Sequence, residues 1–475
     1  MTETLTPDIC VIGAGSGGLS VAAAAAAFGV PVVLIEKGRM GGDCLNVGCV
    51  PSKALIAAAR RAQDARSGGA FGVSVPGVDV AYDRVHQHIH EVIAAIAPND
   101  SVARFAGLGV RVLQADARFV DTDTVAAGDK WLIKARRFVV ATGSVPALPP
   151  IPGLDTTPHL TNETIFDLKQ CPSHLIVIGA GAVGLELAQA YRRLGAEVTV
   201  LEAARPLAKE DPECAQVVLD QLRREGIALR LGVKIASAGR MKGGVRLTLE
   251  DAAAGDALEG SHLLIAAGRK PNVAGLDLDK AGIRTGPAGI LVNKGLRTTN
   301  KRVYAIGDVA GGMQFTHLAN YHAGLVVRNA LFRLPVRTRD DIVPRVTFTD
   351  PELAHVGLTE SEARHRYRKI RVLRWPFHDN DRAQTERDTR GHIKVVTTRH
   401  GKILGATIVG PLAGELVSPW SLAINRRVNI RAMAGVVLPY PTRAEAGKRA
   451  AIDFFTPGLT SPLLRRIIAM LRRFG

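Results

Sequence analysis

The chain has 475 residues and a mass of 50.5 kDa, enough for about three domains. Hydrophobic residues make up 47% of it and charged residues 22%, which is typical of a globular protein and excludes a disordered or fibrous chain. The formal charge of +17 is compatible with nucleic acid, an anionic membrane or anionic cofactors. Because no nucleic-acid motif accompanies that charge, we expect no nucleic-acid partner.

No apolar run reaches the length of a membrane span, and the first residues, MTETLTPDICVIG, carry no secretion signal. The 5 cysteines fit a reducing compartment, so the sequence predicts a cytoplasmic protein.

Residues 8–36 begin with a buried apolar strand, continue through a glycine turn and an alanine-rich helix, and close with a strand that ends at Glu36. The turn contains Gly13, Gly15 and Gly18 in the spacing of a dinucleotide-binding unit. In such a unit the helix N-terminus takes a pyrophosphate and the acid binds a ribose hydroxyl. We therefore expect the first nucleotide to bind here, with Glu36 as its ribose ligand.

The next segment, GGDCLNVGCVPSK, places Cys44 and Cys49 in a glycine-rich loop that enters a helix. Cys49 lies near the expected helix start, with Lys53 one turn further on, and both features favour a thiolate of depressed pKa. A purely structural disulfide is disfavoured in a reducing compartment. The sequence therefore predicts a redox-active cysteine pair.

A helix with His86, His88 and His90 follows, and since a spacing of two scatters these rings over different faces, we expect no metal site. Strands are expected near 110–114 and 131–141. They lead to Ala141-Thr142-Gly143-Ser144 and to a proline-rich linker over 146–153.

A second dinucleotide unit covers residues 175–202, with Gly179, Gly181 and Gly184 in the turn and Glu202 at the end of the strand. Its carboxylate would accept from a free ribose 2′-hydroxyl and repel a 2′-phosphate, which favours NADH over NADPH. Arg205 lies close enough in sequence to weaken that preference.

These segments together resemble the FAD-dependent pyridine nucleotide-disulfide oxidoreductases, the family of dihydrolipoamide dehydrogenase, glutathione reductase and mercuric reductase. The resemblance extends through RTTNKRVYAIGDVAGG, residues 297–312, and the segment that begins VPRVTFTDPELAHVGL. It implies an α/β fold class with two Rossmann-like dinucleotide-binding domains, for FAD and NAD, and a C-terminal α+β dimerisation domain.

The resemblance also implies the domain order. The expected ranges are 1–149 for the first part of the FAD domain, 150–268 for the NAD(P) domain, 269–340 for the second part of the FAD domain, 341–457 for the dimerisation domain and 458–475 for a basic amphipathic tail. Such a chain would be a homodimer whose active site is shared between subunits.

In the family, the first cysteine attacks the substrate sulfur and the second makes a charge-transfer contact with the flavin, which assigns these roles to Cys44 and Cys49. The resemblance also pairs Lys53 with Glu186 beside the flavin. The implied FAD ligands are Gly13, Gly15, Gly18, Glu36, Lys37, Gly42, Lys53, Ala117, Thr142, Gly143, Ser144, Asp308 and Thr316. The implied NAD ligands are Gly179, Gly181, Val183, Gly184, Glu202 and Gly268.

One position departs from the family pattern. Disulfide reductases carry His-Pro-Thr-x-x-Glu, whereas this sequence has Tyr440-Pro441-Thr442 and keeps Glu445. A phenol titrates near pH 10, so Tyr440 is a poor base at neutral pH. Mercuric reductases share the tyrosine, but they deliver metal through a C-terminal cysteine pair, which is not expected here because no cysteine follows Cys214 in the sequence.

The tail sequence LLRRIIAMLRRFG separates apolar residues from arginines at helical spacing. Such a helix could lie on an anionic membrane or pack on the dimer, and the sequence leaves both open.

We therefore expect an FAD-dependent NAD(P)H:disulfide/dithiol oxidoreductase, dihydrolipoamide dehydrogenase-like, with Tyr440 and Glu445 completing the catalytic set. The alternatives are mercuric reductase-like reduction of thiol-bound Hg(II) and a peripheral-membrane electron carrier to a quinone.

Overall fold

The computed structural model describes residues 2–250, 257–459 and 461–474. Two compact units divide the chain. Unit 1 contains Met1–Gly179, Ala190–Leu201 and Val233–Thr338, and unit 2 contains Ala180–Gln189, Glu202–Gly232 and Arg339–Gly475. The five domain ranges expected from the sequence stay predictions.

A five-stranded parallel sheet forms the centre of unit 1, in the order β20-β8-β2-β3-β4. Its strands are β2 (Ile9–Ile12), β3 (Val32–Glu36), β4 (Val110–Gln114), β8 (Arg137–Val140) and β20 (Val303–Ala305). Side chains of β2, β8 and β20 are buried on both faces, as expected of a parallel sheet covered on each side. β20 comes from a segment far along the chain, so two separate parts of the sequence form this sheet.

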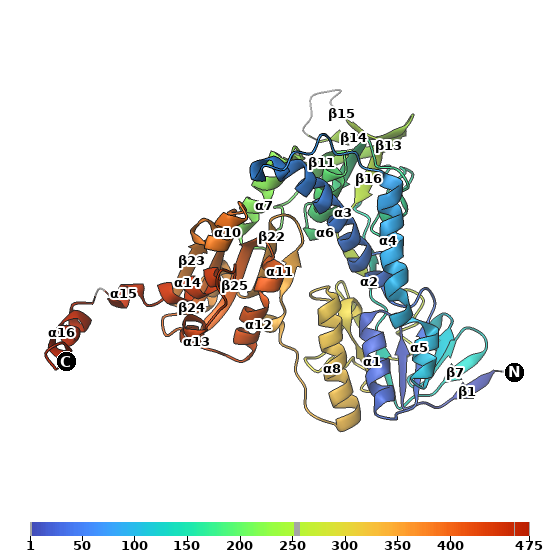
Figure 1. Ribbon diagram of the computed structural model, residues 1–475. Helices are drawn as coiled ribbons and strands as arrows, with labels where there is room; N and C mark the ends of the chain where they lie inside the picture. Colours follow the sequence, from blue (N-terminus) through green and yellow to red (C-terminus); the bar gives the residue numbers. More distant parts are fainter. Residues whose placement is uncertain (1, 251–256, 460, 475) are drawn as a thin grey trace. The chain divides into compact units, whose positions relative to one another are not determined.

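Helices α1 (Ser16–Ala27) and α8 (Thr316–Phe332) lie side by side against this sheet (Figure 1). Gly17 allows the close approach, because a Cβ there would lie 3.2 Å from the Cβ of Ala319. The other helices of unit 1 are α2 (Gly42–Asn46), α3 (Cys49–Ser67), α4 (Tyr82–Ile96) and α5 (Val102–Gly107). Because β2 ends at Ile12 and α1 begins at Ser16, the N-terminus of α1 lies at the carboxyl end of β2.

The second dinucleotide motif folds as parallel strands β16-β10-β11, with β10 (His174–Ile178), β11 (Glu197–Glu202) and β16 (His262–Ile265), and helix α6 (Ala182–Arg193). The remaining strands of unit 1 form smaller sheets. They are β1 (Glu3–Leu5), β5 (Ala117–Phe119), β6 (Val125–Ala127), β7 (Trp131–Ile133), β9 (Ser144–Pro146), β13 (Ile235–Met241), β14 (Gly244–Leu249), β15 (Ala257–Gly260), β17 (Arg269–Pro271), β18 (Thr285–Gly286) and β19 (Gly289–Ile290).

Two details differ from the sequence-based expectation. The single strand expected over 131–141 is two strands, β7 and β8, which belong to different sheets. The glycine-rich loop before the redox helix contains α2, a short helix that carries Cys44. Gly41 and Gly42 both have positive φ, of 88° and 57°, so glycine is needed where the chain turns into α2.

Unit 2 is built on a five-stranded antiparallel sheet in the order β21-β22-β25-β24-β23. Its strands are β21 (Arg345–Thr347), β22 (Glu352–Gly357), β23 (Ile370–Pro376), β24 (His392–Thr398) and β25 (Ile403–Gly410). The apolar face of this sheet, which includes Val356 and Ile393, packs with residues of α12 (Ser418–Asn425) and α14 (Glu445–Asp453). The other elements are α7 (Pro212–Arg224), β12 (Ala228–Leu231), α9 (Glu360–Arg366), α10 (Asp381–Thr385), α11 (Ala413–Leu416), α13 (Ile430–Gly435), α15 (Thr456–Leu459) and α16 (Pro462–Leu471).

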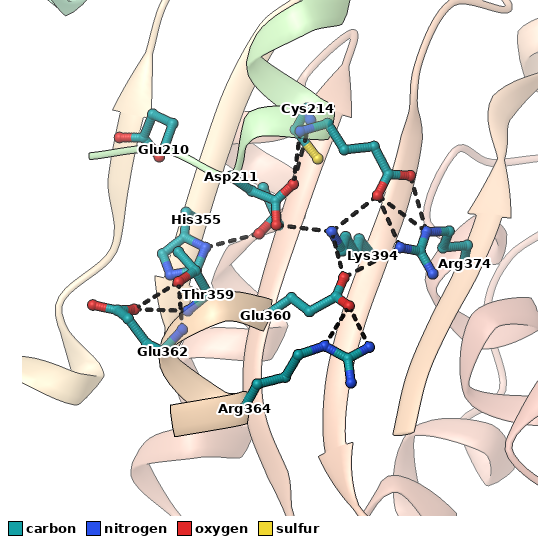
Figure 2. Close-up of polar contacts among 12 residues, drawn as sticks. Glu210, Asp211, Cys214, His355, Thr359, Glu360, Glu362, Arg364, Arg374 and Lys394 are labelled. Atoms are coloured by element: carbon teal, nitrogen blue, oxygen red, sulfur yellow. Dashed lines mark hydrogen bonds and ion pairs between the residues drawn. The ribbon is translucent and has the colours of Figure 1, made fainter. Parts of the chain in front are cut away.

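The opposite face of the same sheet holds a cluster of charged side chains around the buried Lys394 (Figure 2). Strand alternation points this side chain away from the Ile393 face. Its ammonium lies 2.8 Å from Asp211, 2.9 Å from Glu213 and 2.8 Å from Glu360. The sequence analysis did not find this cluster, whose members come from α9, β24, α7 and the residue that caps α7.

Candidate active site

The first glycine turn brings backbone against backbone at the carboxyl end of β2. Gly13 has φ of 102°, and a Cβ there would lie 2.5 Å from the carbonyl oxygen of Ala141. A Cβ on Gly18 would lie 1.9 Å from the oxygen of Gly13. In the described part of the chain no side chain caps α1, whose N-cap is Gly15. Its first amides are therefore directed as donors for an anionic group.

The two predicted ribose acids are held in the same way. Glu36 accepts hydrogen bonds from the amides of Ala14, at 2.6 Å, and Gly38, at 2.7 Å. In the second motif, Glu202 accepts from the amides of Ala180 and Ala204, each at 2.8 Å. Each carboxylate is thus oriented beside its own glycine turn, which is the placement that a ribose ligand needs.

The second turn repeats the close approach of the first. Gly179 has φ of 110°, and a Cβ there would lie 2.5 Å from the carbonyl oxygen of Ala266. Val183 lies half-exposed in the first turn of α6, while Arg205 donates to the carbonyl oxygen of Ala208 and, at 3.5 Å, to that of Glu210. The Arg205 side chain is therefore already engaged by backbone.

The redox pair is present as two thiols, a half-buried Cys44 and an exposed Cys49. A hydrogen bond with Cys49 and burial raise the pKa of Cys44 well above its usual range. The role of Cys49 as the thiolate of the pair stays a prediction.

Cys49 lies where two helices begin. It is the first residue of α3, and its Sγ lies 3.5 Å from the hydroxyl oxygen of Thr316, the first residue of α8. Both helix N-termini carry positive partial charge, which stabilises a thiolate. The sequence predicted the α3 start, whereas the contribution of α8 comes from a segment 267 residues away.

Arg269 joins the cysteine segment to the predicted flavin ligand Asp308. Its guanidinium donates to the Asp43 carboxylate, next to Cys44, and to the Ser144 hydroxyl at 2.7 Å. The Ser144 hydroxyl in turn donates to Asp308 at 2.6 Å. Burial raises the pKa of Asp308, an effect that Ser144 and Arg269 oppose.

Asn162 extends the same network. It accepts from Arg269 at 3.2 Å and donates to the carbonyl of Val47 at 3.1 Å, two residues before Cys49. Sequence reasoning missed Arg269, Asp43 and Asn162. The signal that could have found Arg269 is its position directly after Gly268, a predicted NAD ligand.

The predicted partners Lys53 and Glu186 lie in different units, so their pairing stays a prediction. The Lys53 ammonium donates to the Ser52 hydroxyl at 3.4 Å. Glu186 is buried, and its carboxylate accepts from the amide of Phe348 at 2.8 Å within unit 2.

Tyr440 is exposed, and its hydroxyl donates to Asp381, the first residue of α10, at 2.8 Å. The Asp381 carboxylate raises the pKa of Tyr440, with a smaller effect from Glu445. In the family pattern the glutamate orients the histidine. Here the acceptor of the hydrogen bond from the phenol is Asp381, which the sequence analysis did not identify. Glu445 is the first residue of α14.

The remaining predicted ligands lie along the same edges. Gly42 approaches the first turn so closely that a Cβ would lie 2.8 Å from the Cα of Gly15. The Thr142 hydroxyl donates to the carbonyl of Asn272 at 2.7 Å. Lys37 is exposed after β3, Ala117 begins β5, and Gly143 and Gly268 have φ of 69° and 128°. Their roles as ligands stay predictions.

Two models of known protein families match this chain. Residues 7–323 match the family model described as pyridine nucleotide-disulphide oxidoreductase, and residues 343–451 match the dimerisation domain of the same family.

The chain belongs to the pyridine nucleotide-disulphide oxidoreductase family.

Individual relatives carry two different names. Mercuric reductase of Streptomyces lividans is 35% identical over 94% of this chain and 96% of its own length. Dihydrolipoyl dehydrogenase 3 of Pseudomonas aeruginosa is 36% identical over 94% of this chain and 97% of its own length. Identity is thus nearly equal to relatives of two activities, and it does not choose the substrate.

Two solved structures extend the comparison. LpdA from Mycobacterium tuberculosis matches with a TM-score of 0.86 and 28% identity, over 94% of this chain and 99% of the other. The Cu(II) complex of the HOCl-induced flavoprotein disulfide reductase RclA from Escherichia coli matches with a TM-score of 0.83 and 29% identity, over 93% and 98%.

Membership confirms the expected fold class and an oxidoreductase that uses FAD and a pyridine nucleotide to act on sulfur groups. The dimerisation domain supports the expected homodimer. The residues present fit FAD, since the Gly13 turn has no room for a side chain, α1 offers uncapped amides and Glu36 is oriented beside them. Among the described residues, no helix is long and apolar enough to cross a membrane.

Proposed function

We propose that this enzyme works in the reductive direction, passing electrons from NADH through the Cys44–Cys49 pair to a disulfide or a thiol-bound metal ion. The observation that carries the direction is the hydrogen bond from Tyr440 to Asp381. Dithiol oxidation needs a group that removes thiol protons, and a phenol whose pKa is raised further by a carboxylate does this poorly at neutral pH.

Bound FAD would carry the two electrons of NADH to the cysteine pair. Two electrons break the Cys44–Cys49 bond, and with one proton the pair becomes a Cys44 thiol and a Cys49 thiolate. The raised pKa of Cys44 and the two helix N-termini at Cys49 support this distribution. The Cys49 sulfur of the reduced pair lies beside Thr316.

With a disulfide substrate, Cys44 gives its proton to solvent and attacks one sulfur. The other sulfur leaves as a thiolate that takes a proton from solvent, and a mixed disulfide forms on Cys44. The Cys49 thiolate then attacks Cys44, restores the Cys44–Cys49 bond and releases the second sulfur as a thiolate, which takes a proton from solvent. This is the route by which a dihydrolipoamide dehydrogenase-like enzyme would reduce lipoamide.

The second candidate substrate is a thiol-bound metal ion such as Hg(II). Two observations favour it, the tyrosine at position 440 and the relatives named mercuric reductase. A metal ion that arrives as a thiolate complex needs no histidine to deprotonate a thiol. The metal ion passes from its thiolate ligands to Cys44 and Cys49, and one displaced thiolate takes the Cys44 proton. The structural relative solved with Cu(II) supports the same class of substrate.

A quinone is the third candidate acceptor, and it would require work at a membrane surface. A cytoplasmic location of the enzyme stays a prediction. The preference for NADH over NADPH belongs to this proposal as well, and the orientation of Glu202 by two amides supports it.

Anaerobic titration of the FAD-loaded enzyme with NADH, followed by reoxidation with a panel of acceptors, tests the proposal. Lipoamide, glutathione disulfide, Hg(II) with excess thiol, and a water-soluble quinone form the panel. We expect rapid reoxidation by lipoamide or Hg(II), lost in Cys44→Ser. Reoxidation by quinone alone, unchanged in Cys44→Ser, would overturn the cysteine route and leave the third candidate.

A further inference from the structure

Helix α16 separates its side chains into an apolar half and an arginine half. At 100° per residue, Ile467 and Leu471 lie in the middle of the apolar half, and Ala469 lies in the middle of the arginine half. The apolar half contains Leu463, Leu464, Ile467, Ile468, Met470 and Leu471, and a further apolar residue, Phe474, follows the helix. No residue of α16 is buried, and Phe474 is 82% exposed. A row of large apolar side chains open to water marks a surface that binds something.

The charge of this segment has a single sign. Arg465, Arg466, Arg472 and Arg473 supply four positive charges, and the sequence contains no aspartate or glutamate after Asp453. The partner of the arginine half is therefore anionic.

A second copy of this chain is a poor candidate for that partner. The match to the family's dimerisation domain ends at residue 451, before α16 begins at Pro462. A second copy also carries a formal charge of +17, so four more arginines would meet a surface of like net charge.

We propose that α16 binds to the surface of an anionic phospholipid bilayer and lies in its interface. The apolar half would enter the boundary between headgroups and acyl chains, and the guanidinium groups would bind lipid phosphates. A helix of 10 residues is about 15 Å long, half the thickness of the hydrocarbon core, so it lies on the membrane and does not span it.

Sedimentation of the FAD-loaded, full-length protein with lipid vesicles tests this proposal. One set of vesicles is pure phosphatidylcholine, and the other contains equal parts of phosphatidylcholine and phosphatidylglycerol. We expect at least tenfold tighter binding to the anionic vesicles and release at 0.5 M NaCl, because salt screens the contribution of the arginines. Equal binding to both vesicles, or none to either, would overturn the proposal.

A matched pair of lysine substitutions locates the binding surface. Ile467→Lys places a charge in the middle of the apolar half, and we expect it to weaken vesicle binding at least tenfold. Ala469→Lys places the same charge in the middle of the arginine half and should leave binding unchanged or tighter. Both variants should keep wild-type NADH oxidation, since α16 contains no predicted site residue.

The competing occupant is the protein's own dimer, and the same variants distinguish it. If α16 packs on the second subunit, Ile467→Lys should destabilise the dimer in light-scattering measurements made without lipid. That result, together with vesicle binding equal to wild type, would contradict membrane docking.

Discussion

The hydroxyl of Tyr440 donates a hydrogen bond of 2.8 Å to the carboxylate of Asp381, where the family's disulfide reductases place a histidine close to a glutamate. The contact raises the pKa of the phenol above its ordinary value. The phenol therefore keeps its own proton, which it would have to lose before it could act as a base. Position 440 therefore favours hydrogen-bond donation over proton removal.

Replacing Tyr440 by histidine should restore a base that titrates near neutral pH. General acid-base catalysis contributes about 10²- to 10⁴-fold, so we expect dihydrolipoamide oxidation at pH 7 to rise at least tenfold. Tyr440→Phe should instead lower the turnover of the true acceptor. Both variants are assayed on dihydrolipoamide and Hg(II) from pH 6 to 9. A flat response of the histidine variant, in protein that still dimerises and holds FAD, would exclude dithiol chemistry at this site.

The two cysteines should differ in a spectroscopic test. We expect the two-electron-reduced enzyme to show a long-wavelength absorbance band that survives Cys44→Ser and disappears in Cys49→Ser. The reason is that Cys49 lies where α3 and α8 begin, and both helix N-termini stabilise a thiolate. A band that instead disappears with Cys44 would reverse the two roles.

Glu202 should set the preference for the nicotinamide nucleotide. With its carboxylate oriented by Ala180 and Ala204, we expect kcat/KM to favour NADH over NADPH at least tenfold, or about 1.4 kcal/mol. Glu202→Ala should shrink that ratio, mainly by improving the use of NADPH. Steady-state kinetics with both nucleotides measure the ratio. Equal kcat/KM values for NADH and NADPH in the wild type would show that Arg205 outweighs Glu202.

Arg269 should act as a positioning residue for the flavin site. Arg269→Met removes the charged donor to Asp43 and the contacts to Ser144 and Asn162, and we expect a loss of roughly 2 kcal/mol in stability. The temperature at which FAD fluorescence appears on heating should fall accordingly. Lys270→Met, at the exposed neighbouring residue, is the control and should leave this temperature unchanged. Arg269→Lys should restore this temperature only in part, because an ammonium cannot reproduce the paired donors of a guanidinium.

The charge cluster at Lys394 should make unit 2 sensitive to acid. Hydrogen bonds from Arg374 and Lys394 lower the pKa of Glu213 to about 2, against roughly 4.3 in an unfolded chain. The contribution of the Glu213 carboxylate to stability is therefore fully present above its pKa in the unfolded chain, and it is lost as the pH falls towards 2. We expect Glu213→Gln to lower the melting temperature at pH 7 and to flatten its dependence between pH 5 and 3.

The control for that experiment is Glu415→Gln, at an exposed glutamate of the same unit. Its melting temperature should follow that of the wild type across the same range in calorimetry. Parallel curves for Glu213→Gln and wild type would show that the cluster adds no acid sensitivity.

What the sequence predicted is local, and the reason is physical. A turn such as the one at Gly13 records a steric requirement of its own few residues, and the acid that closes the unit follows at a fixed distance along the chain. The glycines, Glu36, Glu202 and the helix start at Cys49 were therefore found where the structure has them.

The partners that the sequence analysis missed are joined by contacts between distant segments. Arg269 and Asp43 are 226 residues apart, and Asp381 and Tyr440 are 59 apart. An arginine or aspartate is compatible with an ordinary solvated surface, and nothing in its neighbourhood indicates which charge it will meet. The tertiary packing within each unit brings such pairs together.

The pairing of β20 with β8 also determines when the flavin sheet can form during synthesis. Val303 pairs with Phe138, so the last strand of that sheet follows its neighbour by 165 residues. At about 5–20 residues per second, a ribosome needs roughly 8–33 s to make the intervening segment. Throughout that time β8 has an open edge, and the core that includes Phe138 and Val303 is incomplete. A nascent chain stalled before residue 303 should therefore be a good substrate for chaperones and a poor binder of FAD.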